Sequence, residues 1–181
     1  MTDGEGKVIR RVIEQVRELH RSVSLLIRTA ESAMNEAGWQ NGGSGSYALH
    51  EFSYSIDRPD KWMPWEVFRF FKHPDHPTKW ASIAVLLDDA EGRLAEPVVT
   101  GALFEFPTAE AVGFQNWFAS IYKAIPGREA DGQIHEAARA ELSQDWQSSF
   151  DRVWCLALPL VDINSEDDLR EKIVGRLLSA G

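Results

Sequence analysis

The stretch from His73 to Thr78, HPDHPT, carries two histidines three residues apart with an aspartate between them. Histidines at such a spacing can bind zinc, but a catalytic zinc site needs a third protein ligand held in fixed geometry. His50 lies elsewhere in the chain, and no Glu stands in a helical H-E-x-x-H arrangement. We therefore interpret this stretch as a proline-punctuated turn, and we expect no metal and no cofactor.

His73-Pro74-Asp75 is also the tripeptide that marks J-domain co-chaperones, where it lies in the loop between two helices. The flanking sequences depart from that family, because WEVFRFF precedes the tripeptide and WASIAVLL follows it. Aromatic and β-branched residues of this kind are typical of strands. The resemblance is limited to three residues, and it predicts no co-chaperone function.

Two acidic positions could hold a hard cation beside an attacking water, as in metal-dependent nucleases. They are Asp88 or Asp89, and Glu105. The order helix, three or more strands, helix, strand resembles the core of the PD-(D/E)xK nucleases. That signature requires a lysine two residues after the second acid, where this chain has Pro107. A net charge of −9 also repels phosphate backbones. We therefore disfavour a nuclease and predict no nucleic-acid partner.

The remaining motifs of catalysis are missing from the sequence. It has no G-x-S-x-G elbow and no Walker lysine motif, and its one cysteine, Cys155, lies in an apolar run. A single cysteine excludes an intramolecular disulfide and favours a reducing compartment. The first residues have no apolar signal core, and no apolar run approaches the ~18 residues of a membrane helix. We expect a cytoplasmic protein without a membrane partner.

Arg69 is the one cation within WEVFRFF, residues 65–71 of the strand predicted from Trp65 to Lys72. If Val67 and Phe71 share its face, its guanidinium is at least half buried and needs a carboxylate partner. We predict Glu51 or Glu105 as that partner. Small residues are expected on the same side and would leave a groove for a helix or an anionic ligand: Ser53, Ser55, Ser82, Ala84 and Ala102. The alternative is a structural ion pair under a second layer of helices.

Trp62 and Trp65, in the sequence KWMPWE, straddle a predicted turn. An amphipathic indole in such a position often lines a binding surface, although packing in the core is the alternative. The candidate ligand-binding residues are therefore Arg69, Glu51, Trp62 and Trp65.

A long amphipathic helix is predicted for residues 8–37, because three apolar rows repeat every seven residues. The rows are Ile9, Val16, Val23, Ala30 and Ala37; Val12, Leu19, Leu26 and Ala33; and Ile13, His20, Ile27 and Met34. Charged residues from Arg10 to Glu31 occupy the opposite face, which we interpret as solvated. Gly38 is expected to end the helix, with Trp39 folding back onto Met34 in a Schellman motif. Such a helix is roughly 45 Å long, whereas a typical strand spans ~17–20 Å.

The rest of the chain predicts an antiparallel sheet of about five strands. Two apolar runs between Lys79 and Phe106 flank a short polar break with Asp89 and Gly92 in turn positions, which indicates a hairpin. Three further strands are expected at 47–56, 65–72 and 153–163, with Pro159 at an edge or bulge. Residues 41–46, NGGSGS, are predicted to be a flexible connector. Later helices are expected to begin near Thr108, Asp131 and Ser165.

At 181 residues, these elements suit a single α+β domain. We expect the long helix to lie on one face of the sheet and the later helices to cover the other face or one end. A helix longer than the strands must overhang the sheet and meet another helix or a second subunit. The sequence therefore favours a binding or assembly domain, homo-oligomeric, with a further protein partner possible. The alternative is a small-molecule-binding sensor or enzyme with its groove near Arg69.

Overall fold

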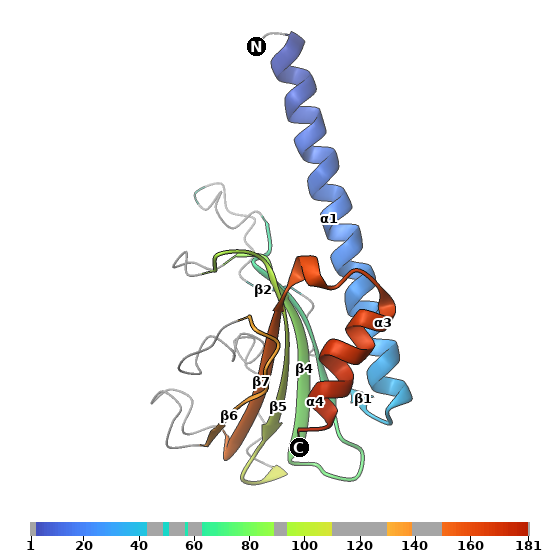
Figure 1. Ribbon diagram of the computed structural model, residues 1–181, viewed down its shortest axis with the longest axis vertical. Helices are drawn as coiled ribbons and strands as arrows, with labels where there is room; N and C mark the ends of the chain where they lie inside the picture. The colour runs from blue at the N-terminus through green and yellow to red at the C-terminus, as the bar shows by residue number, and fades with distance from the viewer. Residues whose placement is uncertain are drawn as a thin grey trace.

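The computed structural model describes residues 3–42, 49–50, 57, 63–88, 94–109, 130–138 and 150–180. The first element is helix α1, Asp3–Glu36, which runs without a break through 34 residues. The predicted uninterrupted helix is therefore confirmed, and it begins five residues earlier than the apolar pattern indicated. Figure 1 shows α1 lying against the sheet with its C-terminal part and extending far beyond it with its N-terminal part.

The C-terminus of α1 has the predicted Schellman geometry. Gly38 adopts a φ of 87°, which suits a residue without a side chain beyond hydrogen. The Trp39 amide donates to the Met34 carbonyl at 2.9 Å, and the Gly38 amide donates to the Asn35 carbonyl at 2.9 Å. These are the two hydrogen bonds that define the motif. Trp39 is buried as a result, and its indole meets His73 edge to face.

Seven strands form one antiparallel sheet in the part of the chain that the structure describes. Their order is β1-β3-β4-β5-β7-β6, and β2 also pairs with β3. The predicted antiparallel sheet is confirmed, and β3, β4, β5 and β7 match predicted strands. The predicted strand 47–56 falls within the described residues only at β2, and β6 lies where a helix was expected. The bounds are β1 Gln40–Asn41, β2 Leu49–His50, β3 Glu66–Lys72, β4 Lys79–Leu86, β5 Val98–Glu105, β6 His135–Ala138 and β7 Arg152–Pro159.

The predicted hairpin is the centre of this sheet. Strands β4 and β5 pair along their whole length, from Lys79 opposite Glu105 to Leu86 opposite Val98. The predicted turn at Asp89 and Gly92 lies outside the described residues. Strand β7 pairs with β5 over eight positions, whereas β6 covers β7 only from Arg152 to Cys155. Pro159 ends β7 beyond β6, where its missing N–H interrupts no pairing with that strand.

The two faces of the sheet are both apolar but carry different residues. Directly opposite residues in antiparallel strands share a face, so the register groups Arg69 with Ile83, Gly101 and Leu156. Helix α1 packs on this face, hereafter the helix face. The opposite face carries an aromatic cluster that is buried: Phe68, Phe70, Phe104, Phe106 and Phe150.

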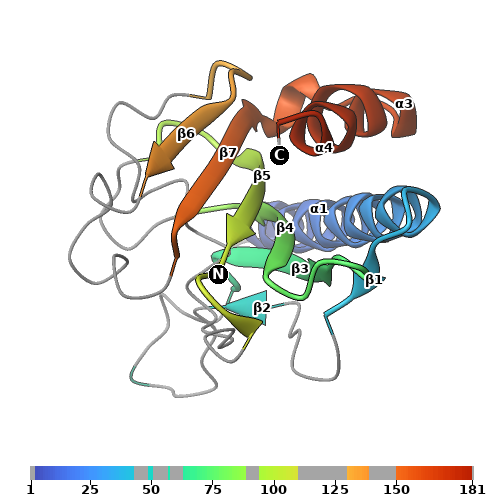
Figure 2. The same ribbon diagram turned by 90° about the horizontal axis from the view of Figure 1, so that it is seen from below.

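The chain after β7 returns to the helix face. A short 3₁₀ turn, Leu160–Asp162, leads to a continuous helical segment over residues 166–178. This segment comprises α3 (Glu166–Leu169), a π-helical part (Arg170–Gly175) and α4 (Arg176–Leu178). Figure 2 shows α3 and α4 on the same side of the strands as α1. The last helix was expected on the other face or at one end, so this placement differs from the prediction.

Gly101 explains how this segment reaches the sheet. A Cβ at Gly101 would lie 3.1 Å from Leu177 Cδ2 and 3.2 Å from Ile173 Cγ2. The missing side chain lets both residues descend onto β5, where they are fully buried. Two helical elements therefore share one face because a glycine in the central strand leaves room for the second.

Three other predictions meet the described residues only in part. The predicted helix after Asp131 is wrong at its start, because residues 135–138 form strand β6 instead. Pairing with the apolar strand β7 supplies backbone partners there, which outweighs the helical spacing of a few apolar residues. The predicted connector 41–46 begins inside the sheet: Asn41 pairs with Phe71, and the Gly42 amide donates to the Phe70 carbonyl at 2.8 Å. The helix predicted from Thr108 falls almost entirely outside the described residues.

Candidate functional site

The N-terminal half of α1 extends beyond the sheet, and we call residues 3–18 the overhang. At 1.5 Å per residue the whole helix is roughly 51 Å long, against about 26 Å for an eight-residue strand. Figure 1 shows the overhang leading away from every labelled strand. The length difference that the sequence predicts is therefore present, and it leaves half of an amphipathic helix without a sheet to cover.

The apolar rows remain exposed along the overhang. The exposed fractions are 47% for Ile9, 51% for Val12 and 46% for Ile13, and 62% for Val8, which borders these rows. We call these four residues the overhang stripe. The same rows are buried where α1 crosses the sheet, with 5% exposure or less at Val23, Ile27, Ala30, Ala33 and Met34. One continuous apolar face thus changes from exposed to buried between Val16 and Val23.

The outer face of the overhang is charged, and it carries two ion pairs within the helix, one of them to Arg21 just beyond the overhang. Arg10 Nε lies 3.1 Å from Glu14 Oε1, and Arg21 Nη1 lies 2.9 Å from Glu18 Oε2. Residues 3–18 contain four acidic and four basic side chains, so the overhang has no formal net charge. The whole net charge of −9 therefore belongs to the rest of the chain.

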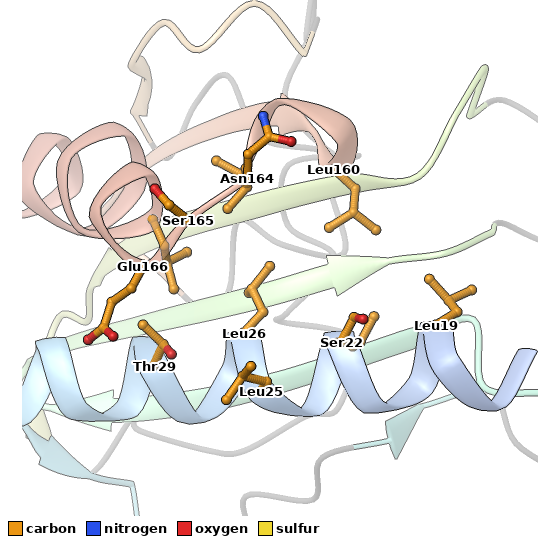
Figure 3. A pocket seen from close by; sticks show the side chains of 12 residues that line it. Leu19, Ser22, Leu25, Leu26, Thr29, Leu160, Asn164, Ser165 and Glu166 are labelled. Atoms are coloured by element: carbon orange, nitrogen blue, oxygen red, sulfur yellow. The ribbon is translucent and has the colours of Figure 1, made fainter. Parts of the chain in front are cut away.

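A groove of about 450 Å³ lies at the base of the overhang, between α1 and the segment that follows β7. Its apolar lining comes from Leu19, Leu25 and Leu26 of α1 and from Leu160, Ile163 and Leu169 opposite. Figure 3 shows Leu19 and Leu160 at one end of the groove and Thr29 and Glu166 at the other. Leu25 is 66% exposed. Leu19, which follows Val12 in the same row, also lines the groove, so the apolar surface of the overhang stripe continues into it.

An ion-pair cluster fixes the far wall of the groove. Arg170 Nη1 donates to Glu36 Oε2 at 2.6 Å and Nη2 donates to Glu36 Oε1 at 3.0 Å, which is a bidentate pair. Arg170 Nη2 also donates to Glu166 Oε1 at 2.9 Å. Ser32 Oγ donates to Glu36 Oε1 at 3.0 Å. The hydrogen bonds from Arg170 first and from Ser32 second hold the pKa of Glu36 below its ordinary value. The two carboxylates raise the pKa of Arg170. The last helix is thus tied to the end of α1.

A capping box begins that helix, as predicted. Ser165 Oγ accepts a hydrogen bond from the Asp168 amide at 3.0 Å, and Asp168 Oδ2 accepts one from the Asn164 amide at 3.0 Å. Lys172 Nζ lies 2.6 Å from Asp168 Oδ1. Hydrogen bonds from Lys172 and from the Asn164 backbone lower the pKa of Asp168. The loop 163–165 that forms one wall of the groove is therefore held at its helix start.

Arg69 has a carboxylate neighbour from a different element than predicted. Arg69 Nε lies 3.6 Å from Glu31 Oε1 of α1, and the two side chains are only 29% and 24% exposed. Glu31 Oε1 also accepts from Asn41 Nδ2 at 2.7 Å. Glu31 was assigned to the solvated face of the helix; instead it joins α1 to β1 and β3. This ion pair agrees with the structural alternative for Arg69.

The other predicted neighbours of Arg69 do not surround it. Glu105 pairs with Lys79 and Arg152. It lies four residues along β5 from Gly101, the β5 residue that is level with Arg69 across the sheet. Ser82, Ala84 and Ala102 are paired with residues of the opposite face. The strand alternation was thus assigned with the wrong phase for these small residues. Glu51 and Trp62, like Ser53 and Ser55, lie outside the described residues.

Trp65 is half-buried just before β3. Its carbonyl accepts a hydrogen bond from the Leu87 amide at 2.7 Å, which extends the pairing of β3 and β4 by one step. The backbone of Trp65 thus has a structural role. Its role in ligand binding stays a prediction, as it does for Arg69.

The histidine turn forms a second, smaller hollow of about 340 Å³ near Trp39 and Trp154. The rings of His73 and His76 are 4.7 Å apart, and His73 Nδ1 accepts from the Asp75 amide at 3.2 Å. Among the described residues, no three His, Cys, Asp or Glu side chains are grouped in a way that could hold a metal ion. Local hydrogen bonding of this kind is typical of a tight turn.

The comparisons with known proteins identify no relative: no protein-family model, curated protein or solved structure matches the chain. Within the described residues, no helix is both long enough and apolar enough to span a membrane. The candidate site is therefore defined by its geometry alone. The overhang is predictable from the helix length, but the groove is not, because residues 160–163 continue the apolar run of the last strand.

Proposed function

We propose that this protein is an assembly domain that self-associates through the overhang of α1. The observation that supports the proposal is the overhang stripe, four Val and Ile side chains between 46% and 62% exposed on one face of a helix. Scattered apolar residues on a surface need no explanation, but a contiguous row marks an interaction surface. An isolated helix of ~12–15 residues is only marginally stable in water, so the overhang gains stability when a partner covers it.

The charge distribution supports a partner of the same kind. Binding of a nucleic acid or another anionic partner would require an excess of positive charge on the overhang. The overhang has no formal net charge. The rest of the chain is acidic, so the acidic parts of two copies repel each other electrostatically. The overhang is therefore the part of the described structure where two copies meet without that repulsion.

Light scattering coupled to size-exclusion chromatography tests this function. We expect the wild-type protein to elute as an oligomer at tens of micromolar. Replacement of Ile9, Val12 and Ile13 by Gln should convert it to a monomer with an unchanged melting temperature of the folded body. Gln keeps a good helix propensity, so the loss would reflect the apolar surface.

The matched control places Gln on the outer face of the same helical turns, at Arg10, Arg11 and Glu14. This variant should remain oligomeric, because its substitutions leave the overhang stripe intact. A wild-type mass that is still monomeric at about 100 µM means a dissociation constant well above that concentration, and it contradicts the proposed function.

The alternative, a small-molecule site near Arg69, stays a prediction. Glu31 of α1 lies 3.6 Å from Arg69, whose side chain is still 29% exposed. A thermal-shift screen with metabolites and divalent ions tests this alternative. The cytoplasmic location also stays a prediction; it is consistent with Cys155, which is fully buried as a thiol.

A further inference from the structure

We propose that the overhang stripe is covered by the overhang of a second copy of this chain, and that the two helices run antiparallel. This inference rests on the proposed function and adds the identity and the direction of the partner. It follows from the position of the overhang stripe on α1. The helix face that is exposed in the overhang is the same face that packs on the sheet in the C-terminal half of α1.

The sheet excludes the parallel arrangement. Ile9, Val12 and Ile13 precede Val23, Leu26 and Ile27 by two heptads and therefore point to the same side of α1. Val23 and Ile27 are buried against the sheet, at 2% and 4% exposure. The folded body thus lies on the stripe side of the helix. If two copies were packed stripe to stripe in parallel, both sheets would occupy the same space at the same level.

An antiparallel pair removes this collision, because each body then lies at the opposite end of the pair. The apolar rows also match in this direction. With Ile9 opposite Leu19 of the second copy, Val12 lies opposite Val16 of the second copy, and the same two pairs recur by symmetry. The two helix dipoles are then opposed, which is favourable.

The groove adds to this interface at both ends. In the register just described, residue 6 of one copy is level with Ser22 of the other, which lines the groove together with Leu160 and Ile163. A strip about 22 Å long and 10 Å wide covers only roughly 220 Å², well below the ~800 Å² per partner of a standard interface. The first turn of each helix, seated at the groove of the other copy, enlarges the buried area.

Charge favours the same arrangement. The overhang has no net charge, whereas the body carries the −9 of the chain. An antiparallel pair separates the two acidic bodies by the length of the paired overhangs. On the outer face, Arg10 and Glu14 form an ion pair within one helix and therefore need no charged partner from the second copy.

Disulfide trapping tests the direction of the helices. Cys155 is fully buried, so new thiols on α1 are the reactive ones. The variants Val12→Cys, carrying an affinity tag, and Val16→Cys, without one, are mixed in equal amounts and oxidised gently. We expect the mixed disulfide in large excess over both homodisulfides, identified on a non-reducing gel and by mass spectrometry. A mixture of Arg11→Cys and Glu18→Cys, on the outer face, should cross-link slowly.

The outcomes separate this inference from the proposed function. If Val12→Cys alone forms its homodisulfide as fast as the mixture forms the mixed one, the antiparallel pair is overturned, while self-association through the stripe stands. If light scattering finds the wild-type chain monomeric under the same conditions, the proposed function fails and the inference fails with it. Preferential mixed cross-links in an oligomeric protein support both.

Discussion

The two halves of α1 carry the same apolar repeat in different surroundings. Ile13 is 46% exposed, whereas Ile27, two heptads later in the same row, is 4% exposed. Sequence spacing gives both residues the same position on the helix. The sheet and the last helix cover only the second half. Heptad periodicity therefore predicts an apolar helix face that another surface should cover. The tertiary contacts decide whether that surface comes from the same chain.

This comparison also distinguishes stability from assembly. In the second half of α1, the apolar residues contribute to the free energy of unfolding of a single chain. In the overhang, the same residue types add little to that quantity until a second surface covers them. Substitutions at equivalent heptad positions should therefore produce different kinds of defect.

The largest effect is expected from a matched pair of substitutions in one row. Ile27→Ala removes a buried side chain from the helix face and should lower the free energy of unfolding by about 2–5 kcal/mol. Ile13→Ala should change it by much less, but should weaken self-association. Urea unfolding at concentrations where the protein is monomeric measures the first quantity, and sedimentation equilibrium measures the second.

The comparison fails if Ile13→Ala destabilises the monomer as much as Ile27→Ala does. That result would mean that the overhang is packed against a part of its own chain. Ala is the best helix former, so neither substitution weakens the helix through its intrinsic propensity.

A smaller effect is expected where the last helix meets the sheet. Gly101→Val inserts a side chain where Leu177 and Ile173 are already 3.1–3.2 Å from a Cβ position. Overpacking of this kind should cost about 1–3 kcal/mol. It should also weaken association, because displacement of the helical segment 166–178 alters the wall of the groove. Unfolding curves and sedimentation of the same variant measure both changes.

Leu177→Ala provides the test of the cause. The smaller side chain returns space above Gly101, so the double variant should lose less stability than the two single variants together. Strict additivity would mean that Gly101 and Leu177 do not compete for the same space.

Sequence patterns predict the elements of this fold better than their mutual positions. The central hairpin, the uninterrupted helix, its Schellman end at Gly38 and the capping box at Ser165 each depend on local rules, and each is confirmed. The placement of the last helix beside α1 depends on the space above Gly101, which appears only after β4, β5 and β7 are assembled. No local pattern contains that information.

The candidate site shows the same limit. The charge of Arg69 predicts a carboxylate neighbour, but Glu31 was assigned to solvent because its helix face is mostly charged. The angle at which α1 crosses β3 brings Glu31 close to Arg69. This angle depends on the packing of the helix on the assembled sheet and cannot be predicted from local sequence patterns. The groove was missed because Leu160 and Ile163 continue the apolar run of β7. The exposed overhang was predictable, since it follows from comparing two lengths.

A still smaller, pH-dependent effect is expected at the contact between the end of α1 and the last helix. The Arg170 hydrogen bonds lower the pKa of Glu36 below its ordinary value of 4.5. The ionised pair therefore stabilises the fold above pH 4.5, and this contribution is lost as the pH falls through the lowered pKa. Arg170→Gln should reduce the melting temperature slightly at neutral pH.

The difference between wild type and Arg170→Gln should shrink when the pH falls below 4.5, because protonated Glu36 no longer gains from the guanidinium. Thermal melts of both proteins across the acid range measure it. Glu36→Gln serves as the control: it removes the carboxylate that titrates, so the melting temperature of this variant should lack the pH-dependent contribution of the pair. A difference that grows toward acid pH would contradict the assignment.

The smallest effect is expected on the outer face of the overhang. Arg10 and Glu14 form an ion pair of 3.1 Å, with side chains 83% and 59% exposed. Exposed pairs of this spacing contribute at most about 0.5 kcal/mol, so Arg10→Gln should leave both unfolding and association nearly unchanged. Val12→Gln, two residues away, introduces the same side chain on the overhang stripe and should reduce association strongly. Sedimentation equilibrium of the two variants at equal concentration compares them directly. Equal losses would assign the contact to surface charge, whereas a loss confined to Val12→Gln assigns it to the apolar face that the sheet leaves uncovered.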